Sequence, residues 1–226
     1  PNEEDLNHDT LLMWAAYKTD NNAVNELKAQ ILTKLIENQN IDITLQHQSN
    51  RKNALMVLAA NGHFDKITDL MKKQDNKFMQ AAKQTDENGW NSLMYATLKS
   101  PYVNPQDRKK CVELLIEKLS KSDVNQGDNN GTTAAMHAIE FQDQAVIDAF
   151  IEHMNWDDPK VEIEKTNNRS ENILHYISSF GGVENLSGLT CKLNALNLPN
   201  SNGQTPTDIA NSKQDYEFVR TVKNSK

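Results

Sequence analysis

The feature that most restricts the fold of this chain is a short motif that returns six times along its 226 residues. Each copy joins a polar turn to the start of a helix that carries small and apolar side chains. The same helix position is filled by Leu12, Leu55, Leu93, Ala135, Leu174 and Thr207, at steps of 43, 38, 42, 39 and 33 residues. Self-similarity at such a period predicts a solenoid of stacked helical units.

The residues of the motif suit a turn followed by a helix. Glycines at 89, 131 and 203 allow the positive φ of a tight turn. A Thr, Ser or Asn then stands where its side chain can cap the first helix. Small residues such as Ala59 and Ala96 let neighbouring helices approach closely. Because one unit cannot bury its apolar face alone, the units are expected to stack and share one continuous core.

The motif resembles the ankyrin repeat. The segment 53–63 reads Asn-Ala-Leu-Met-Val-Leu-Ala-Ala-Asn-Gly-His, and an amphipathic stretch follows it at 64–71, as in the second helix of that repeat. The segment 202–210 begins with Asn-Gly-Gln-Thr-Pro, and 122–125 reads Ser-Asp-Val-Asn, close to the end of the family's unit. Along nearly the whole chain, the resemblance implies an all-α ankyrin-repeat solenoid with short turn or hairpin tips.

We expect a single ankyrin-repeat domain over 1–226, built from about six helix-turn-helix repeats. The predicted repeats span 6–45, 46–83, 84–125, 126–165, 166–199 and 200–226. Several features depart from the family pattern. Extra residues fall at 38–40, 100–107 and 155–165, and the turn glycine is replaced by Arg51 and by Ser170, so irregular inter-repeat loops and irregular turns are expected there. Gly181 and Gly182 are expected to turn one helix into the next.

Composition limits the kind of partner and compartment. Hydrophobic residues make up 37% of the chain and the net charge is −7, which disfavours nucleic acid and anionic membranes as partners. No apolar run is long enough to span a bilayer, and the acidic start does not resemble a signal peptide. Cys111 and Cys191 lie 80 positions apart. We therefore expect buried thiols, a reducing cytoplasmic location and a monomer, with no membrane insertion.

Catalytic and metal-binding patterns are weak in this sequence. His63 and His175 fall at scaffold positions of the family, which implies imidazoles bonded to backbone. His153 with Asp157 and Asp158 fits a solvated loop better than a metal cluster, and the segment from Asp123 lacks the glycine and glutamate of a calcium loop. We expect no cofactor, no bound metal and no enzymatic activity.

The resemblance implies a partner protein on the concave face, which the turn tips and the exposed ends of the first helices form. The residues predicted to contact it are Trp90, Glu87, Asn88, Lys52, Asn129, Asn130, Thr132, Phe141, Arg169, Glu171, Phe180 and Tyr17. Glu140 stands beside Phe141 at one helix end. Trp90 is expected at an exposed tip, as an interface anchor. Trp14, Tyr95 and Tyr176 are expected in the core instead.

Three functional interpretations follow. The first is a protein-interaction module, and its asparagine- and lysine-rich character is similar to that of ankyrin effectors which intracellular bacteria deliver into host cells. The second is the ankyrin fragment of a larger protein with a separate catalytic domain, which the absence of an initial Met favours. The third is an enzyme that uses the 155–165 insert on an ankyrin scaffold.

Overall fold

A computed structural model describes residues 10–38, 40–154, 159–181, 193–215 and 218–220. The chain divides into two compact units, unit 1 at 1–119 and unit 2 at 120–226. The described residues contain helices and no strand, with isolated bridges between Gln46 and Asn53 and between Gly127 and Thr133. This architecture confirms the all-α prediction. Among the described residues, no helix is both long and apolar enough to cross a membrane.

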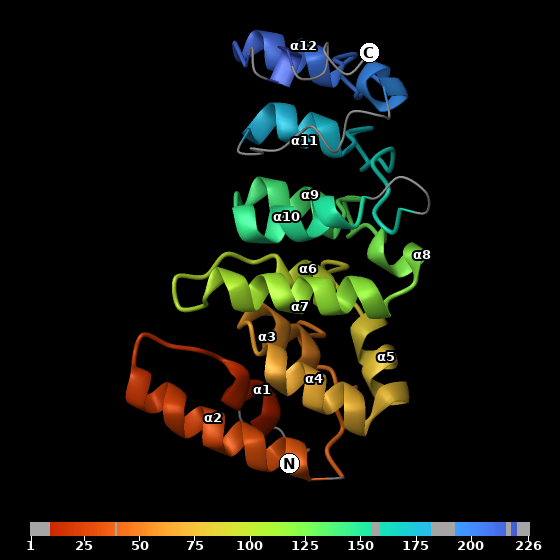
Figure 1. The fold of residues 1–226 in the computed structure, drawn as a ribbon. Helices are drawn as coiled ribbons and strands as arrows, with labels where there is room; N and C mark the ends of the chain where they lie inside the picture. Colours follow the sequence, from red (N-terminus) through yellow and green to blue (C-terminus); the bar gives the residue numbers. More distant parts are fainter. Residues whose placement is uncertain (1–9, 39, 155–158, 182–192, 216–217, 221–226) are drawn as a thin grey trace. The chain divides into compact units, whose positions relative to one another are not determined.

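Unit 1 consists of helix pairs in which a short helix is followed by a longer one (Figure 1). Its helices are α1 (Leu11–Ala16), α2 (Asn22–Glu37), α3 (Ala54–Ala60), α4 (Phe64–Lys73), α5 (Asp75–Lys83), α6 (Ser92–Ala96) and α7 (Pro105–Lys118). Helix α3 packs between α1 and α6, and each of these short helices also contacts the longer helix that follows it. Helix α5 is a further helix between two pairs, which accounts for part of the irregular spacing in the sequence.

Unit 2 also contains a short helix that is followed by a longer one (Figure 1). Its elements are α8 (Lys121–Val124), α9 (Ala134–Glu140), α10 (Gln144–Glu152), α11 (Ile173–Phe180), the 3-10 helix η2 (Leu193–Asn197) and α12 (Pro206–Ser212). Helix α11 packs on α9 and on α12. Gly181 ends α11 with a positive φ of 67°, as expected of a turn, whereas Gly182 and residues 155–158 of the 155–165 insert lie outside the described residues.

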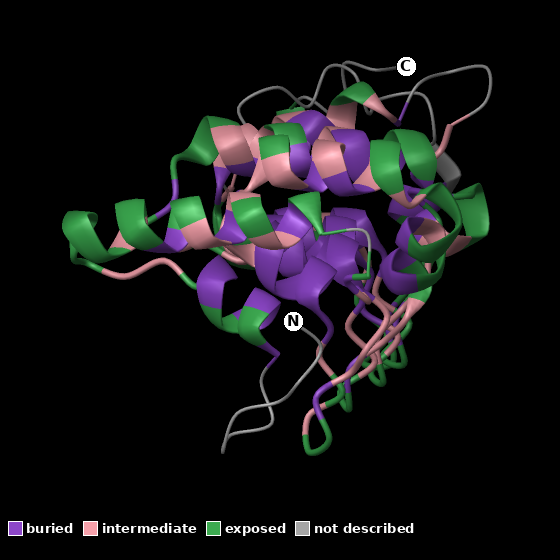
Figure 2. Ribbon diagram, turned by 90° about the horizontal axis from the view of Figure 1, so that it is seen from below, coloured by how far each residue is buried: buried purple, intermediate pink, exposed green. Residues whose placement is uncertain are grey.

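The first helix of each pair begins at a capping side chain, as the sequence predicts. The caps are Thr10, Asn53, Asn91, Thr133, Asn172 and Thr205, and each side-chain oxygen accepts a hydrogen bond from a backbone N–H of the first turn. All but Thr205 are buried. Figure 2 shows buried residues gathered on the helices and connecting loops that are mostly intermediate or exposed.

Buried side chains on these short helices form the core of each unit. Tyr95 and Tyr176 are 7% and 5% exposed, which confirms their predicted place in the core. Trp14 is 40% exposed, so the prediction of a core position for it was wrong. The Lys28 ammonium lies over its indole ring, 4.6 Å from the ring centre, and also donates to the carbonyl of Tyr17.

His63 behaves as the family position implies, because its Nε2 lies 2.8 Å from the carbonyl oxygen of Ala16. Burial lowers the pKa of His63 to about 4, from 6.5 in an ordinary histidine, and the bond to Ala16 only partly opposes this. His175 shows the same behaviour: burial lowers its pKa, and its Nε2 lies 3.2 Å from the carbonyl oxygen of Gln204. Both histidines therefore connect one repeat to the next as neutral groups.

The lowered pKa of His63 predicts an acid-sensitive unit 1. Between pH 6.5 and pH 4 the unfolded chain binds a proton that the folded chain excludes, so stability present above pH 6.5 is lost as the pH falls. From pH 7 to pH 5 this group alone should remove about 2 kcal/mol of unfolding free energy. Urea unfolding followed by circular dichroism at both pH values should show a smaller loss for His63→Gln than for the unchanged chain. Equal losses would contradict the assignment.

Candidate functional site

Each hairpin tip is organised by one polar side chain at its start. The Asp86 Oδ1 accepts from the N–H groups of Asn88 and Trp90, both at 2.8 Å. The leading residues of the other regular tips make the same pair of bonds, and they are Asp128, Asn167 and Asn200. This pattern fixes the backbone of the tip, so that its side chains are presented from a rigid frame.

Two tips lack the turn glycine, and their turns differ in length and hydrogen bonding. Ser170 adopts a φ of 58° and its tip keeps the same bonds as the glycine tips, so the prediction of an irregular turn was wrong there. Arg51 also has a positive φ of 59°, but its turn is one residue longer, with the Arg51 N–H bonded to the His47 carbonyl. His47 takes the place of the leading carboxylate, since its Nδ1 lies 3.2 Å from the Ser49 nitrogen.

Neighbouring tips within a unit are joined by backbone hydrogen bonds. In unit 1 the Glu87 N–H donates to the Asn50 carbonyl at 3.0 Å. In unit 2 the Asn168 N–H donates to the Asn130 carbonyl, and the Ser201 N–H donates to the Arg169 carbonyl, both at 2.8 Å. The tips of each unit therefore form a continuous ridge held by main-chain contacts. A surface ordered in advance loses less conformational entropy when a partner binds.

A second regular contact runs from the leading residue to the ninth residue after it. In unit 1 the Tyr95 hydroxyl donates to Asp86 Oδ2 at 2.9 Å, and burial together with this carboxylate raises the pKa of Tyr95 well above its usual value. In unit 2 the Asp128 Oδ2 lies 3.0 Å from His137 Nε2, and the Asn167 Nδ2 donates to the Tyr176 hydroxyl at 3.2 Å. We did not predict this contact from the sequence, although each of the three pairs is separated by nine residues there.

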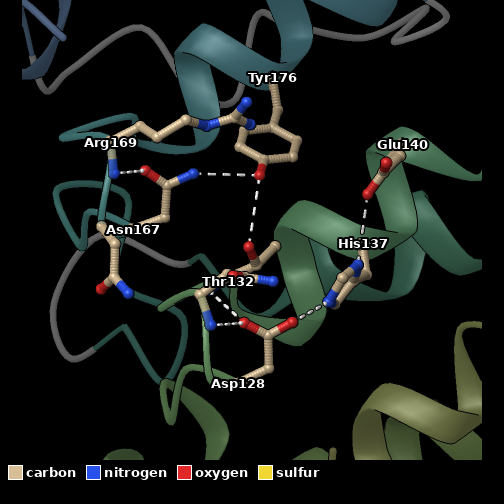
Figure 3. Close-up of a pocket in the computed structure, with 9 residues that line it drawn as sticks. Asp128, Thr132, His137, Glu140, Asn167, Arg169 and Tyr176 are labelled. Carbon is tan, nitrogen blue, oxygen red and sulfur yellow. Dashed lines mark hydrogen bonds and ion pairs between the residues drawn. The ribbon is translucent and has the colours of Figure 1, made fainter. Parts of the chain in front are cut away.

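Between the first two tips of unit 2 lies a cavity of about 380 Å³, here called the inter-hairpin pocket. Its lining residues are Asp128, Asn130, Thr132, His137, Glu140, Asn167, Asn168, Arg169 and Tyr176. Figure 3 shows His137 and Glu140 on one side of it, on α9, and Arg169 with the ring of Tyr176 on the other. The pocket is therefore bordered by carboxylates at one side and by a guanidinium at the other.

His137 stands between two carboxylates of the pocket. Its Nε2 faces Asp128 Oδ2 at 3.0 Å and its Nδ1 faces Glu140 Oε2 at 3.3 Å (Figure 3). Because a neutral imidazole carries one N–H, the ring donates to both carboxylates only when it is protonated. The ring of Phe141 stacks on His137, with centres 5.8 Å apart. His137 thus contacts both acids and one aromatic ring.

Arg169 is paired on the opposite side of the pocket. Its guanidinium lies 2.9 Å from Glu171 Oε2, and the nearby Glu171 carboxylate raises the pKa of Arg169. The Arg169 side chain is 71% exposed and that of Glu171 is 17% exposed. Arg169 and Glu171 together carry no net charge, so the unbalanced charge of the pocket comes from Asp128 and Glu140.

The predicted contact residues of unit 1 differ in how far they are exposed to solvent. Glu87 and Asn88 are exposed at their tip, and Tyr17 is 38% exposed at the end of α1. Trp90 is half-buried rather than fully exposed, because its ring meets Tyr95 edge-on with centres 5.7 Å apart. Lys52 is also half-buried, with its ammonium 5.4 Å from the centre of the Tyr95 ring.

In unit 2 the predicted tip residues Asn129, Asn130 and Arg169 are exposed, and Phe180 is 41% exposed. Thr132 is 5% exposed, so its predicted place on the surface was wrong. Its hydroxyl faces that of Tyr176 at 3.5 Å, and this contact holds Thr132 between the two tips. Phe141 and Glu171 are half-buried. The pocket brings together Asn130, Thr132 and Arg169 with residues that were not predicted as contacts, among them Asp128, His137 and Tyr176.

Reactive and metal-binding groups are sparse in the described part of the chain. No group of three His, Cys, Asp or Glu residues in that part is arranged to hold a metal ion. Cys111 is buried in α7, and burial raises the pKa of its thiol to about 12. A thiol with so high a pKa is a poor nucleophile at neutral pH. Cys191, Asp157 and Asp158 lie outside the described residues.

Comparison with known families agrees with this geometry. Residues 12–118 match the family of ankyrin repeats, in three copies. Residues 12–118 of the chain are ankyrin repeats. Beyond the matched region, the capped helices and linked tips of unit 2 follow the same pattern as those of unit 1. No curated protein matches the ankyrin chain.

Proposed function

We propose that this ankyrin protein binds a partner protein through its ridges of hairpin tips and the exposed ends of its first helices. Ankyrin repeats are generally protein-interaction modules. The observation that carries the proposal is the backbone bonding between tips, from Glu87 to Asn50 in unit 1 and from Asn168 to Asn130 in unit 2. These bonds hold exposed polar side chains in fixed positions, and such a surface suits a wet, hydrogen-bonded interface.

The exposed aromatic side chains supply candidate anchors for this interface. Tyr17 in unit 1 and Phe180 in unit 2 each end a first helix and remain exposed. Aromatic residues concentrate binding energy where they become buried on association. The proposal assigns binding rather than catalysis to the chain, and it includes a cytoplasmic location and an effector role in a host cell.

The test is affinity capture from eukaryotic cell lysate with quantitative mass spectrometry. Three variants are compared with the unchanged chain: Glu87→Ala with Asn88→Ala, Arg169→Ala with Phe180→Ala, and a control with Lys118→Ala and Glu152→Ala. Both control residues are exposed and end second helices. We expect a protein that is depleted about tenfold by at least one tip variant and retained by the control. Equal capture by all forms would contradict a site on the tips.

A further inference from the structure

The acidic charge of this protein is concentrated in unit 2. Residues 1–119 contain fifteen Lys and Arg against sixteen Asp and Glu, a net charge of −1, whereas residues 120–226 contain nine against fifteen, a net charge of −6. The stretch 122–159 holds eight carboxylates and no Lys or Arg. This stretch includes α9 and α10 and one wall of the inter-hairpin pocket. A cationic partner would therefore be attracted to unit 2 far more than to unit 1.

Of the two carboxylates that line the pocket, Glu140 is the one that an incoming cation can reach. Asp128 is 4% exposed at its side chain, and its two oxygens accept from Asn130, Thr132 and His137. The Glu140 side chain is 42% exposed, and the contact of its Oε2 with His137 sets its direction. Even with a protonated His137, the two acids leave this side of the pocket negative.

The ring of Tyr176 lines the pocket, and two further rings at the ends of the first helices contact lining residues. Phe141 follows Glu140 and stacks on His137, and Phe180 lies against Tyr176 with ring centres 5.9 Å apart. The Gln142 Nε2 donates to the Phe180 carbonyl, which joins the two helix ends. Aromatic faces next to a carboxylate match the side chain of arginine or lysine, because the alkyl stem packs on a ring while the charged head pairs with the acid.

We propose that the inter-hairpin pocket of unit 2 receives an arginine or lysine side chain from a basic segment of the partner protein, which pairs with Glu140. This inference rests on the proposed function and specifies the chemistry of the partner. The cavity of about 380 Å³ has room for one such side chain, and the Arg169–Glu171 pair on the far side is internally neutralised. The backbone of the basic segment would lie along the exposed tips, at Asn130 and Arg169.

The experiment uses fluorescence anisotropy with the full chain and a short fluorescein-labelled peptide of alternating arginine, glycine and serine. A peptide of the same length with glutamate in place of arginine is the negative probe. We expect Glu140→Gln to weaken binding of the arginine peptide about tenfold, and Glu152→Gln to change it less than about twofold. Both glutamates are the last residues of their helices and both substitutions remove one charge, but Glu152 lies outside the residues lining the pocket.

The control separates contact in the pocket from general attraction. Equal weakening by Glu140→Gln and Glu152→Gln would show attraction by net charge alone and would overturn the proposal. Failure of the arginine peptide to bind, or equal binding of the glutamate peptide, would overturn it as well. If lysate capture still depends on Arg169 and Phe180 in that case, the interaction function stands and only the basic partner is wrong. A Glu140→Lys variant that gains binding to the glutamate peptide would support a direct contact.

Discussion

Replacing Asn53 with alanine is expected to lower the free energy of unfolding of unit 1 by about 3 kcal/mol. Asn53 is fully buried, and its Oδ1 caps α3 by accepting from the Met56 N–H at 2.9 Å. Its Nδ2 donates to the Ala81 carbonyl and to Gln84 Oε1, both at 2.8 Å. Alanine removes the cap and also leaves the Ala81 carbonyl without this donor.

The matched control is Asn21→Ala, because Asn21 caps α2 in the same unit but is exposed. Its loss should cost about 1 kcal/mol or less, since water can replace the bond to the Val24 N–H. Asn53→Ser keeps a capping oxygen without the amide donor and should fall between the two. Urea unfolding followed by circular dichroism measures all three. A cost for Asn53→Ala no greater than that for Asn21→Ala would show that the bond to α5 contributes nothing.

Gly127→Ala is expected to destabilise unit 2 by about 2–3 kcal/mol through a steric clash. A Cβ at position 127 would lie 2.6 Å from the carbonyl carbon and oxygen of Gly131, across the base of the tip. These are backbone atoms, so relief requires the tip to open. Opening would shift Asp128 away from His137 and so disturb the inter-hairpin pocket.

Gly203→Ala is the control for Gly127→Ala, because it tests the strain of a left-handed backbone without a steric clash. Gly203 has a φ of 75°, and a Cβ there would meet nothing within 4 Å. Its replacement should cost about 1 kcal/mol, from the left-handed backbone alone. Urea unfolding should therefore rank Gly127→Ala as the more damaging change. The opposite order would mean that the tip at 128–132 accommodates a Cβ by moving without loss of stability.

Repeat architecture and helix starts were predictable because they depend on local chemistry. A capping Asn or Thr before an apolar run specifies where a helix begins, and all six first helices begin at such a cap. Ser170 was harder to predict, because serine disfavours a positive φ. The Asn167 side chain and the backbone bonds of its tip hold that conformation in spite of the local preference. The division into six repeats within one domain stays a prediction.

By itself, the sequence determined the ankyrin family, the all-α class and the ends of the first helices, because each follows from residues within one repeat. Tertiary structure decided which tip residues stay exposed. Trp90 packs on Tyr95 and Thr132 is buried against Tyr176, since each side chain meets one from elsewhere in its unit. The tertiary structure also brings Asp128, His137 and Glu140 together. In unit 1 it lets Asn53 donate to α5 as well as cap α3. Such contacts depend on how a tip or helix packs against its neighbours, which a local pattern does not encode.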